Sequence, residues 1–298
     1  MPRLRYSSSS GHNNYVAEYD NIEELVKDRL SMAPGILQIT ELTKVDKGIC
    51  LIFDYRTLNL KYSFRFVDLD NDEHRLEVMS TADNQKRLEY LEYHTGDGYD
   101  AAWGFLTKVY ATFRGETKRF QIIVDTWPAV ITTIPQIRKI PEWYVSLDDH
   151  IYPEFLDTMG DSDNVTTARF VGKDGRCFVM PQNFFDTEFA KNLKSLTIDV
   201  HNEMNDEILM KTKTQKMIIK QSSISEIGIN EKISQWYQGD SILAMMVLHT
   251  KYQIDEDVVK CGLRCEEDEN RQITIQRKDG KLAELSFSNQ FVRFKVVN

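Results

Sequence analysis

Three short stretches of this chain carry residue types that take part in catalysis or metal binding. Cys261 and Cys265 have a spacing found in metal sites, but no second pair of Cys or His lies at a usable distance. The Asp-Asp-His run at 148–150 has no Ser or Cys in a nucleophile context. The Gly-Asp-Gly run at 96–98 lacks the third glycine and the preceding strand of a dinucleotide-binding loop. The sequence therefore predicts no catalytic residue, no metal site and no cofactor.

The composition of the chain indicates which classes of protein it can belong to. The 298 residues are 41% hydrophobic and 11% aromatic, which is enough for a sizeable core. A formal net charge of −9 argues against sequence-independent nucleic-acid binding, which needs clustered Lys and Arg. Four dispersed cysteines are typical of reduced thiols, and no apolar run reaches membrane-spanning length. Residues 1–19 read as a polar, disordered tail without a signal peptide, so we expect a cytoplasmic or nuclear protein that is not secreted.

Residues 20–113 predict short helices, then strands, then a long helix. The helices occupy 20–48, with a break at Pro34-Gly35. Alternating apolar runs at 49–53, 62–67 and 75–79 predict half-buried strands. Residues 83–93 are charged and helix-prone, and 99–113 predict a helix with one apolar face.

From residue 120 onward, short apolar strands alternate with helical segments. The predicted strands begin 21 to 28 residues apart, at 120–124, 144–147, 168–171, 196–198, 217–219 and 245–248. The predicted helices lie at 152–159, 184–193, 206–211 and 227–237. This period is typical of leucine-rich-repeat solenoids with parallel strands, while a compact α/β domain without solenoid character is the alternative.

The last seventy residues contain a capped helix followed by strands. Ser223 and Ser225 are both suitable N-caps, and Glu226 in the first turn favours Ser225. Gly239 is the predicted C-cap, and an apolar stripe along the helix includes Trp236 as a core anchor. Strands at 272–277 and 282–287 flank an Asp-Gly turn, and 290–297 adds a third. We expect this meander to cap the repeat, with the charged turn exposed to solvent.

These C-terminal phrases resemble the F-box-associated domain that nematodes carry in large numbers. The helix phrase is Ile-Asn at 229–230 with Ile-Ser-Gln-Trp-Tyr-Gln-Gly at 233–239, and the strand phrase is Ile-Thr-Ile-Gln-Arg-Lys-Asp-Gly at 273–280. The residues that match the family pattern are Asn230, Trp236, Gly239, Arg277, Asp279 and Gly280. The resemblance assigns 49–298 to that domain, most specifically over 190–298. The predicted fold is α/β: an irregular leucine-rich-repeat-like strand/helix repeat with a C-terminal β meander and a small helical F-box-like segment before it.

By this resemblance the chain is a substrate-recognition subunit of an SCF-type cullin–RING ubiquitin ligase, not an enzyme. A degenerate F-box at 20–48 would dock on the ligase adaptor subunit, although the family's leading Leu-Pro pair is missing. The adaptor-binding residues would be Leu25, Leu30, Pro34, Ile36 and Leu42. An unknown protein substrate would lie on exposed residues of the repeat strands, for which the candidates are Tyr144, Ser146, Arg169, Thr197, Lys216 and His249.

Two other functions remain open at this point. One is an adaptor-independent protein-binding module that has lost its F-box. The other is a glycine N-acyltransferase-like enzyme, suggested by the phrase Phe-Gln-Ile-Ile-Val-Asp-Thr-Trp-Pro at 120–128. Against the enzyme, no glycine-rich turn for a coenzyme A pyrophosphate follows downstream.

Overall fold

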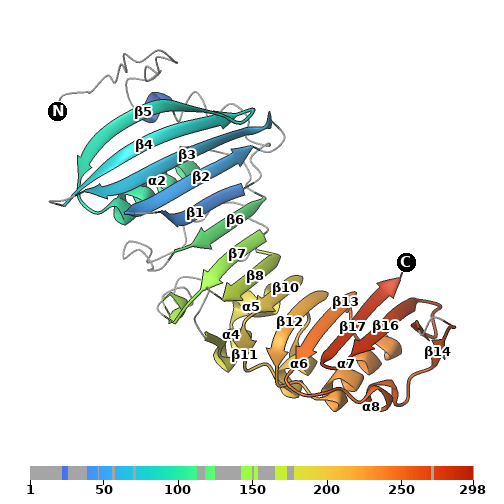
Figure 1. The fold of residues 1–298 in the computed structure, drawn as a ribbon. Helices are drawn as coiled ribbons and strands as arrows, with labels where there is room; N and C mark the ends of the chain where they lie inside the picture. The colour runs from blue at the N-terminus through green and yellow to red at the C-terminus, as the bar shows by residue number, and fades with distance from the viewer. Residues whose placement is uncertain are drawn as a thin grey trace. The chain divides into compact units, whose positions relative to one another are not determined.

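The computed structural model describes residues 22–25, 39–45, 47–55, 58–69, 72–112, 118–124, 142–149, 151–153, 165–172, 178–269 and 272–297. The predicted disordered tail at 1–19 lies outside these residues. The chain divides into two compact units, residues 1–145 with 150–159, and residues 146–149 with 160–298. Each unit combines a sheet with few helices, which confirms the α/β class (Figure 1).

The first unit is an antiparallel meander joined to a parallel strand. Its strands are β1 (Ile39–Val45), β2 (Gly48–Tyr55), β3 (Leu60–Leu69), β4 (Glu73–Ala82), β5 (Gln85–Thr95), β6 (Arg119–Ile123) and β7 (Glu142–Leu147). The order β6-β1-β2-β3-β4-β5 is antiparallel except between β1 and β6, and β7 runs parallel to β6. The helices are α1 (Ile22–Leu25) and α2 (Gly98–Thr112).

The core of the first unit lies between α2 and the middle of the sheet. The Phe105 ring of α2 lies 4.7 Å from the Phe64 ring and 6.1 Å from the Phe66 ring, both on β3. Alternate residues of β3 and β4 are buried, as a sheet covered on one face requires. The predicted strands at 49–53, 62–67 and 75–79 and the long helix are confirmed.

Two helix predictions in this unit are wrong. Residues 39–45 form β1, hydrogen-bonded to β2 on one side and to β6 on the other, so this part of the predicted helical segment 20–48 is a strand. Residues 83–93 belong to the β4–β5 hairpin, whose turn residues Asp83 and Asn84 have φ of 48° and 64°. Such a turn matches the twist of paired strands, and Asp and Asn tolerate positive φ. Strand pairing therefore overrides the helix propensity of the charged segment.

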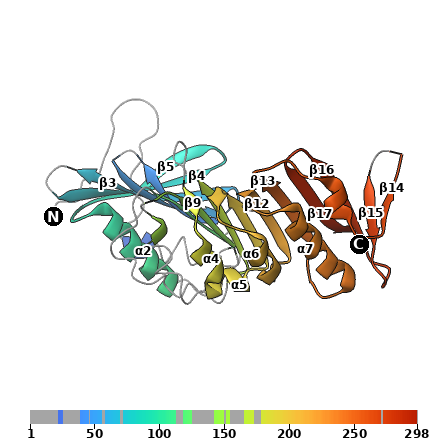
Figure 2. The ribbon, with the colours of Figure 1, turned by 90° about the horizontal axis from the view of Figure 1, so that it is seen from below.

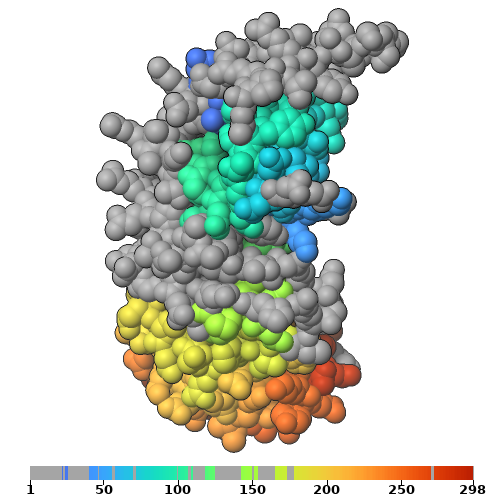
Figure 3. Space-filling model, turned by 90° about the vertical axis from the view of Figure 1, so that its left-hand side faces the viewer, coloured from blue at the N-terminus to red at the C-terminus, as the bar shows by residue number. Residues whose placement is uncertain are grey.

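The second unit alternates strands and helices before it ends in a meander. Its strands are β8 (Thr167–Gly172), β9 (Val179–Met180), β10 (Ser195–Asp199), β11 (His201–Asn202), β12 (Lys216–Ser222), β13 (Met245–Thr250), β14 (Cys265–Glu267), β15 (Ile273–Gln276), β16 (Leu282–Ser288) and β17 (Phe291–Val297). Its helices are α4 (Gln182–Asp186), α5 (Glu188–Asn192), α6 (Asp206–Lys211), α7 (Glu226–Gln238) and α8 (Glu256–Lys260). Figure 3 shows residues from about 180 onward, coloured yellow to red, as one closely packed surface.

Parallel and antiparallel pairing meet at β13. Strands β8, β10, β12 and β13 are parallel, and β17, β16, β15 and β14 follow in antiparallel order. All six predicted repeat strands and the C-terminal meander are confirmed. The predicted helix at 184–193 is two short helices, because Thr187 leaves helical geometry and caps the second of them. The predicted helix at 152–159 falls mostly outside the described residues.

The helices of the second unit lie on one face of its sheet (Figure 2). The strand residues that face them are fully or nearly fully buried, among them Ile198, Met217, Ile219, Met246, Leu248 and Phe294. The predicted caps of α7 are confirmed, since the Ser225 side chain accepts a hydrogen bond from the Gly228 amide and Gly239 has φ 96°. A buried amide, Asn202, donates to the carbonyls of Val200 and Lys220 and thereby ties neighbouring turns together.

Candidate functional site

The opposite face of this sheet is covered by none of the described helices or strands. We call it the open face; it comprises the outward residues of β8, β10, β12, β13 and β17, namely Arg169, Thr197, Ile218, Val247 and Arg293 in one row and Ser195, Lys216, Met245 and Lys295 in the next. These side chains are half-buried or exposed, whereas the residues between them along each strand are buried against the helices. The open face is therefore a surface of ordered, regularly spaced side chains.

A parallel sheet with one uncovered face is unusual. Parallel strands are usually covered on both faces, because crossover helices lie on the two sides of the sheet. In the part of the chain that the structure describes, α4–α8 cover one face of β8, β10, β12 and β13 and leave the other bare (Figure 2). Repeat proteins with this arrangement use the bare strand surface for binding.

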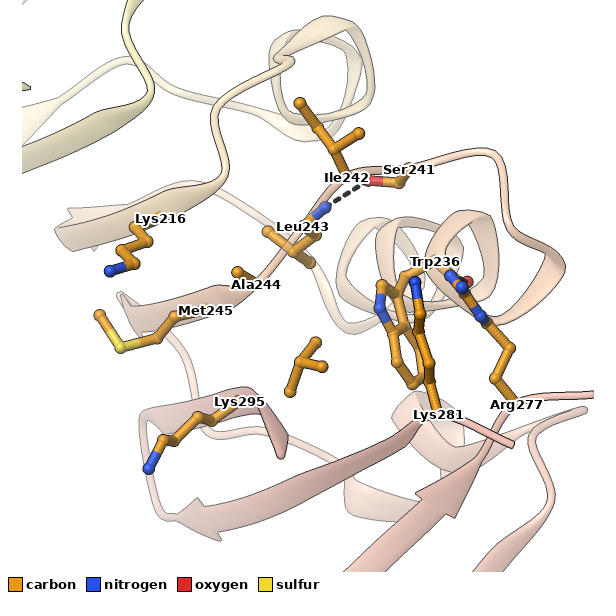
Figure 4. Close-up of a pocket in the computed structure, with 11 residues that line it drawn as sticks. Lys216, Trp236, Ser241, Ile242, Leu243, Ala244, Met245, Arg277, Lys281 and Lys295 are labelled. Carbon is orange, nitrogen blue, oxygen red and sulfur yellow. Dashed lines mark hydrogen bonds between the residues drawn. The ribbon is translucent and has the colours of Figure 1, made fainter. Parts of the chain in front are cut away.

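A pocket of about 430 Å³ lies at the edge of the sheet where β12 and β13 begin and β17 ends. We call it the edge pocket; its lining residues are Lys216, Trp236, Ser241, Ile242, Leu243, Ala244, Met245, Arg277, Lys281, Lys295 and Val296. Figure 4 shows Lys216, Met245 and Lys295 on one side, and Trp236, Lys281 and Arg277 on the other. Since Lys216, Met245 and Lys295 also belong to the open face, the two surfaces are continuous.

Trp236 and Arg277 form a closely packed wall of the edge pocket. The indole is buried and packs edge-on against Phe294 at 5.0 Å, and the Arg277 guanidinium lies 5.3 Å from its ring centroid. Arg277 also donates to the Trp236 carbonyl and to both carboxylate oxygens of Asp279. The hydrogen bonds from Arg277 hold the pKa of the Asp279 carboxyl well below the usual range of an aspartate. Arg277 therefore joins the β15–β16 hairpin to α7. The sequence pattern predicts only that this charged turn is exposed to solvent, and not its contact with α7.

The remaining cations of the edge pocket form no close ion pair with the described residues, although the charge of Lys281 contributes to lowering the pKa of Asp279. Lys216, Lys281 and Lys295 are exposed, and none of their ammonium groups forms an ion pair or hydrogen bond with another described residue. Glu284 on β16 is in register with Lys295 but lies beyond ion-pair distance. No Asp or Glu lines the edge pocket. The result is a concentration of positive charge in a chain whose formal net charge is −9.

The predicted substrate-binding residues are only partly brought together. Arg169 and Thr197 are neighbours on the open face, and Lys216 lies one row away and lines the edge pocket. His249 lies at the other end of β13, where its ring packs 5.0 Å from Phe291. Ser146 is buried with 7% exposure, unlike the exposed residue that was predicted, and Tyr144 is half-buried on β7 in the first unit.

The predicted adaptor-binding residues do not form an exposed helical surface in the described residues. Leu42 is fully buried in β1, and Leu25 in α1 is fully buried as well. Leu30, Pro34 and Ile36 lie outside the described residues. Of the family markers, Trp236 and Gly239 end α7, Arg277 and Asp279 form the ion pair, and Gly280 occupies the turn at φ 87°. Asn230 donates to the carbonyls of Val259 and Cys261 and so holds α8 against α7.

Three titratable side chains gather toward the carboxyl ends of β10, β12 and β13. Lys220 forms an ion pair of 2.7 Å with Asp199, and His249 lies within electrostatic range of both. Burial, followed by the charge of Lys220, lowers the pKa of His249, so its ring is neutral at pH 7. The hydroxyl of Ser222 faces the His249 carbonyl at 3.5 Å rather than its ring. The Ser222 hydroxyl is thus not placed for activation by this histidine.

The cysteines and acidic residues show no metal site within the described ranges. No group of three or more His, Cys, Asp or Glu is arranged to hold an ion there. Burial raises the pKa of Cys50 to about 11 and also raises that of Cys265, so both remain protonated thiols at neutral pH. None of the described helices has the length and apolar character needed to cross a membrane.

A buried lysine joins two of the helices. Lys232 of α7 is 2% exposed, and its ammonium group donates to the carbonyl of Thr212, the C-cap of α6, at 2.7 Å. Burial lowers its pKa to about 8 from 10.5. Its position at a helix C-terminus gives it a structural role, since cations stabilise that end.

We expect Lys232 to make stability depend on pH in the alkaline range. Between about pH 8 and 10.5 the folded chain has released this proton while the unfolded chain still holds it, so the free energy of unfolding rises with pH. The gain is on the order of 3 kcal/mol across the window. Urea unfolding at several pH values should show this slope in the native chain and lose it in Lys232→Met. Lys213→Met, at an exposed neighbouring position, should keep the slope; an equal slope in both variants would contradict the assignment.

Comparisons with known proteins find no match: no family model, no curated protein and no solved structure is sufficiently similar to this chain.

Proposed function

We propose that this chain is a non-enzymatic protein-binding module that holds its partner on the open face of the second unit. The observation that carries the proposal is a parallel run, β8-β10-β12-β13, whose described helices all lie on one face. Half-buried apolar residues there, Ile218 and Val247, are in register on neighbouring strands and are flanked by cations. Such a mixture of apolar and polar side chains suits a protein interface.

The strand-and-helix alternation supports a leucine-rich-repeat-like reading of this unit. Successive parallel strands are joined by α4 and α5, by α6 and by α7, and each joining segment returns the chain to the same edge of the sheet. In a solenoid of this kind the strands form one continuous receptor surface. We extend the proposal to substrate recognition for an SCF-type ubiquitin ligase, for which the support is the resemblance of the C-terminal phrases to the F-box-associated domain.

Of the two forms of the proposal, the pairing of β1 supports the one in which the chain has lost its F-box. An F-box needs a helical module of its own, yet 39–45 are committed to β1 in the interior of the first unit. An adaptor-independent binding protein accommodates this arrangement without a further assumption.

The open face is tested by substitutions that keep its charge. We expect Ile218→Gln with Val247→Gln to abolish most partner capture by the full-length chain from a cell extract, measured by quantitative mass spectrometry. Ile227→Gln is the matched control, because Ile227 is 62% exposed on α7, on the helical side. If the open-face variant retains the same proteins as the control, the partner binds elsewhere.

The link to a ligase needs a separate experiment. The adaptor subunit is tested for binding to the full-length chain and to a chain that begins at Gln38, which keeps β1 intact. Binding by the full-length chain alone would place an adaptor-docking segment before β1. Absence of binding by both, with partner capture retained, identifies an adaptor-independent module and removes the ligase proposal.

A further inference from the structure

The edge pocket brings together three lysines that form no ion pair with another described residue. Several lysines elsewhere in the second unit pair with neighbouring carboxylates: Lys191 with Glu188, Lys211 with Glu207, Lys220 with Asp199, and Lys260 with Glu256 and Asp257. Lys213 and Lys278 are exposed and form no ion pair with a described residue, but neither lines the edge pocket. Lys216, Lys281 and Lys295 have no such partner among the described residues. Three like charges around one pocket repel one another unless an anion binds between them.

The three lysines surround apolar surface. Lys216, Met245 and Lys295 lie in one row across β12, β13 and β17, so Met245 stands between two ammonium groups. Adjacent strands are about 4.8 Å apart, which places the two lysine backbones roughly 10 Å apart. Lys281 stands beside the Trp236 indole on the other side of the pocket (Figure 4). At the rim, Ile242 is 62% exposed.

We propose that the edge pocket binds an acidic peptide segment of the partner protein, with carboxylates flanking an apolar side chain. The carboxylates would meet Lys216, Lys281 and Lys295, while the apolar side chain would contact Met245 and Ile242. This inference rests on the proposed function, and it names the chemistry by which the open face recognises its partner. Charge complementarity of this kind sets specificity and speeds association.

A peptide fits these features better than nucleic acid does. Nucleic-acid surfaces neutralise a run of phosphates with many cations, and the chain as a whole carries a formal net charge of −9. The edge pocket has three unpaired ammonium groups around apolar surface, and its aromatic ring is not available as a stacking platform, because Trp236 is 2% exposed and lies under Arg277.

The test uses the full-length protein and an array of short peptides, each present in a glutamate, a glutamine and a lysine version around a central apolar residue. We expect selection of glutamate versions, with affinities at least about tenfold above those of their glutamine counterparts by fluorescence anisotropy. The affinity should fall steeply between about 0.1 M and 1 M salt, where the Debye length shrinks from about 10 Å to about 3 Å. Replacing the central apolar residue by glycine should also weaken binding.

Charge reversal locates the site. Lys216→Glu with Lys295→Glu should lower the affinity for the selected peptide at least about tenfold, while Lys251→Glu with Lys278→Glu should leave it within about twofold. All four positions are exposed, and the control pair lies outside the edge pocket, so the two variants carry the same change in net charge.

Three results would overturn the inference. They are equal binding of glutamate and glutamine peptides, equal effects of the two charge reversals, and tighter binding of a single-stranded oligonucleotide that the edge-pocket variant abolishes. If the array result is negative while Ile218→Gln with Val247→Gln still abolishes partner capture, the open face binds a partner by other chemistry and only the present inference fails.

Discussion

Trp236→Ala is expected to destabilise the second unit by about 3–5 kcal/mol, the usual cost of removing a large buried aromatic side chain. The indole fills the space between α7 and the sheet, where it contacts Phe294, and it supports the Arg277 guanidinium. Its loss leaves a cavity and removes the ring over which Arg277 lies, so the β15–β16 turn should also loosen. Hydrogen exchange measured by mass spectrometry should show faster exchange in peptides from α7 and β17.

Two companion variants make the Trp236 result specific. Trp236→Phe keeps an aromatic ring in the cavity and should cost less than the alanine variant. Ile227→Ala, at an exposed site on the same helix, should change the free energy of unfolding by no more than about 0.5 kcal/mol. A small effect of Trp236→Ala, comparable with that of Ile227→Ala, would mean that the indole is not the anchor of this helix.

Leu42→Ala is expected to destabilise the first unit by about 2–5 kcal/mol. Leu42 is fully buried, and the strand that carries it pairs with β2 and β6, so the truncation leaves a cavity inside a sheet layer. An F-box helix would instead expose this leucine to the adaptor, and the substitution would then leave stability nearly unchanged. Urea unfolding, followed with hydrogen exchange over β1 and β2, distinguishes the two structures.

Thr43→Ala is the control for Leu42. Thr43 follows Leu42 in β1, so its side chain points to the other face of the sheet, where it is half-buried. We expect it to cost less than about 1 kcal/mol, from lost strand propensity. Equal effects at the two positions would show that 39–45 do not form an interior strand.

The sequence by itself determined the local structure of the second unit. The apolar strand cores, the helix at 206–211, the caps Ser225 and Gly239 and the closing meander are all predictable, because each depends on residues close together in the chain. The parallel pairing followed from the alternation of strand and helix. Trp236 was predictable as a core anchor from its place in an apolar stripe.

Only the tertiary structure decided the secondary structure of segments whose sequence pattern is compatible with both helix and strand. Residues 40–44 and 83–93 have helix-compatible sequences, and pairing with other strands makes them strands. The partner of 40–44 is β6 at 119–123, far along the chain, and the partner of 85–93 is β4 at 73–82, across a tight hairpin. The Asp-Asn turn at 83–84 was the available signal for the hairpin.

The candidate site was likewise decided by pairing across the sheet. Lys216 was predictable as an exposed strand residue, but Lys281 and Lys295 lie more than sixty residues away in the sequence. The register of β12, β13 and β17 brings Lys216 and Lys295 to either side of Met245, and the β15–β16 turn adds Lys281 beside Trp236. Local pattern specifies which face of a strand each side chain takes, and only strand order and register specify its neighbours.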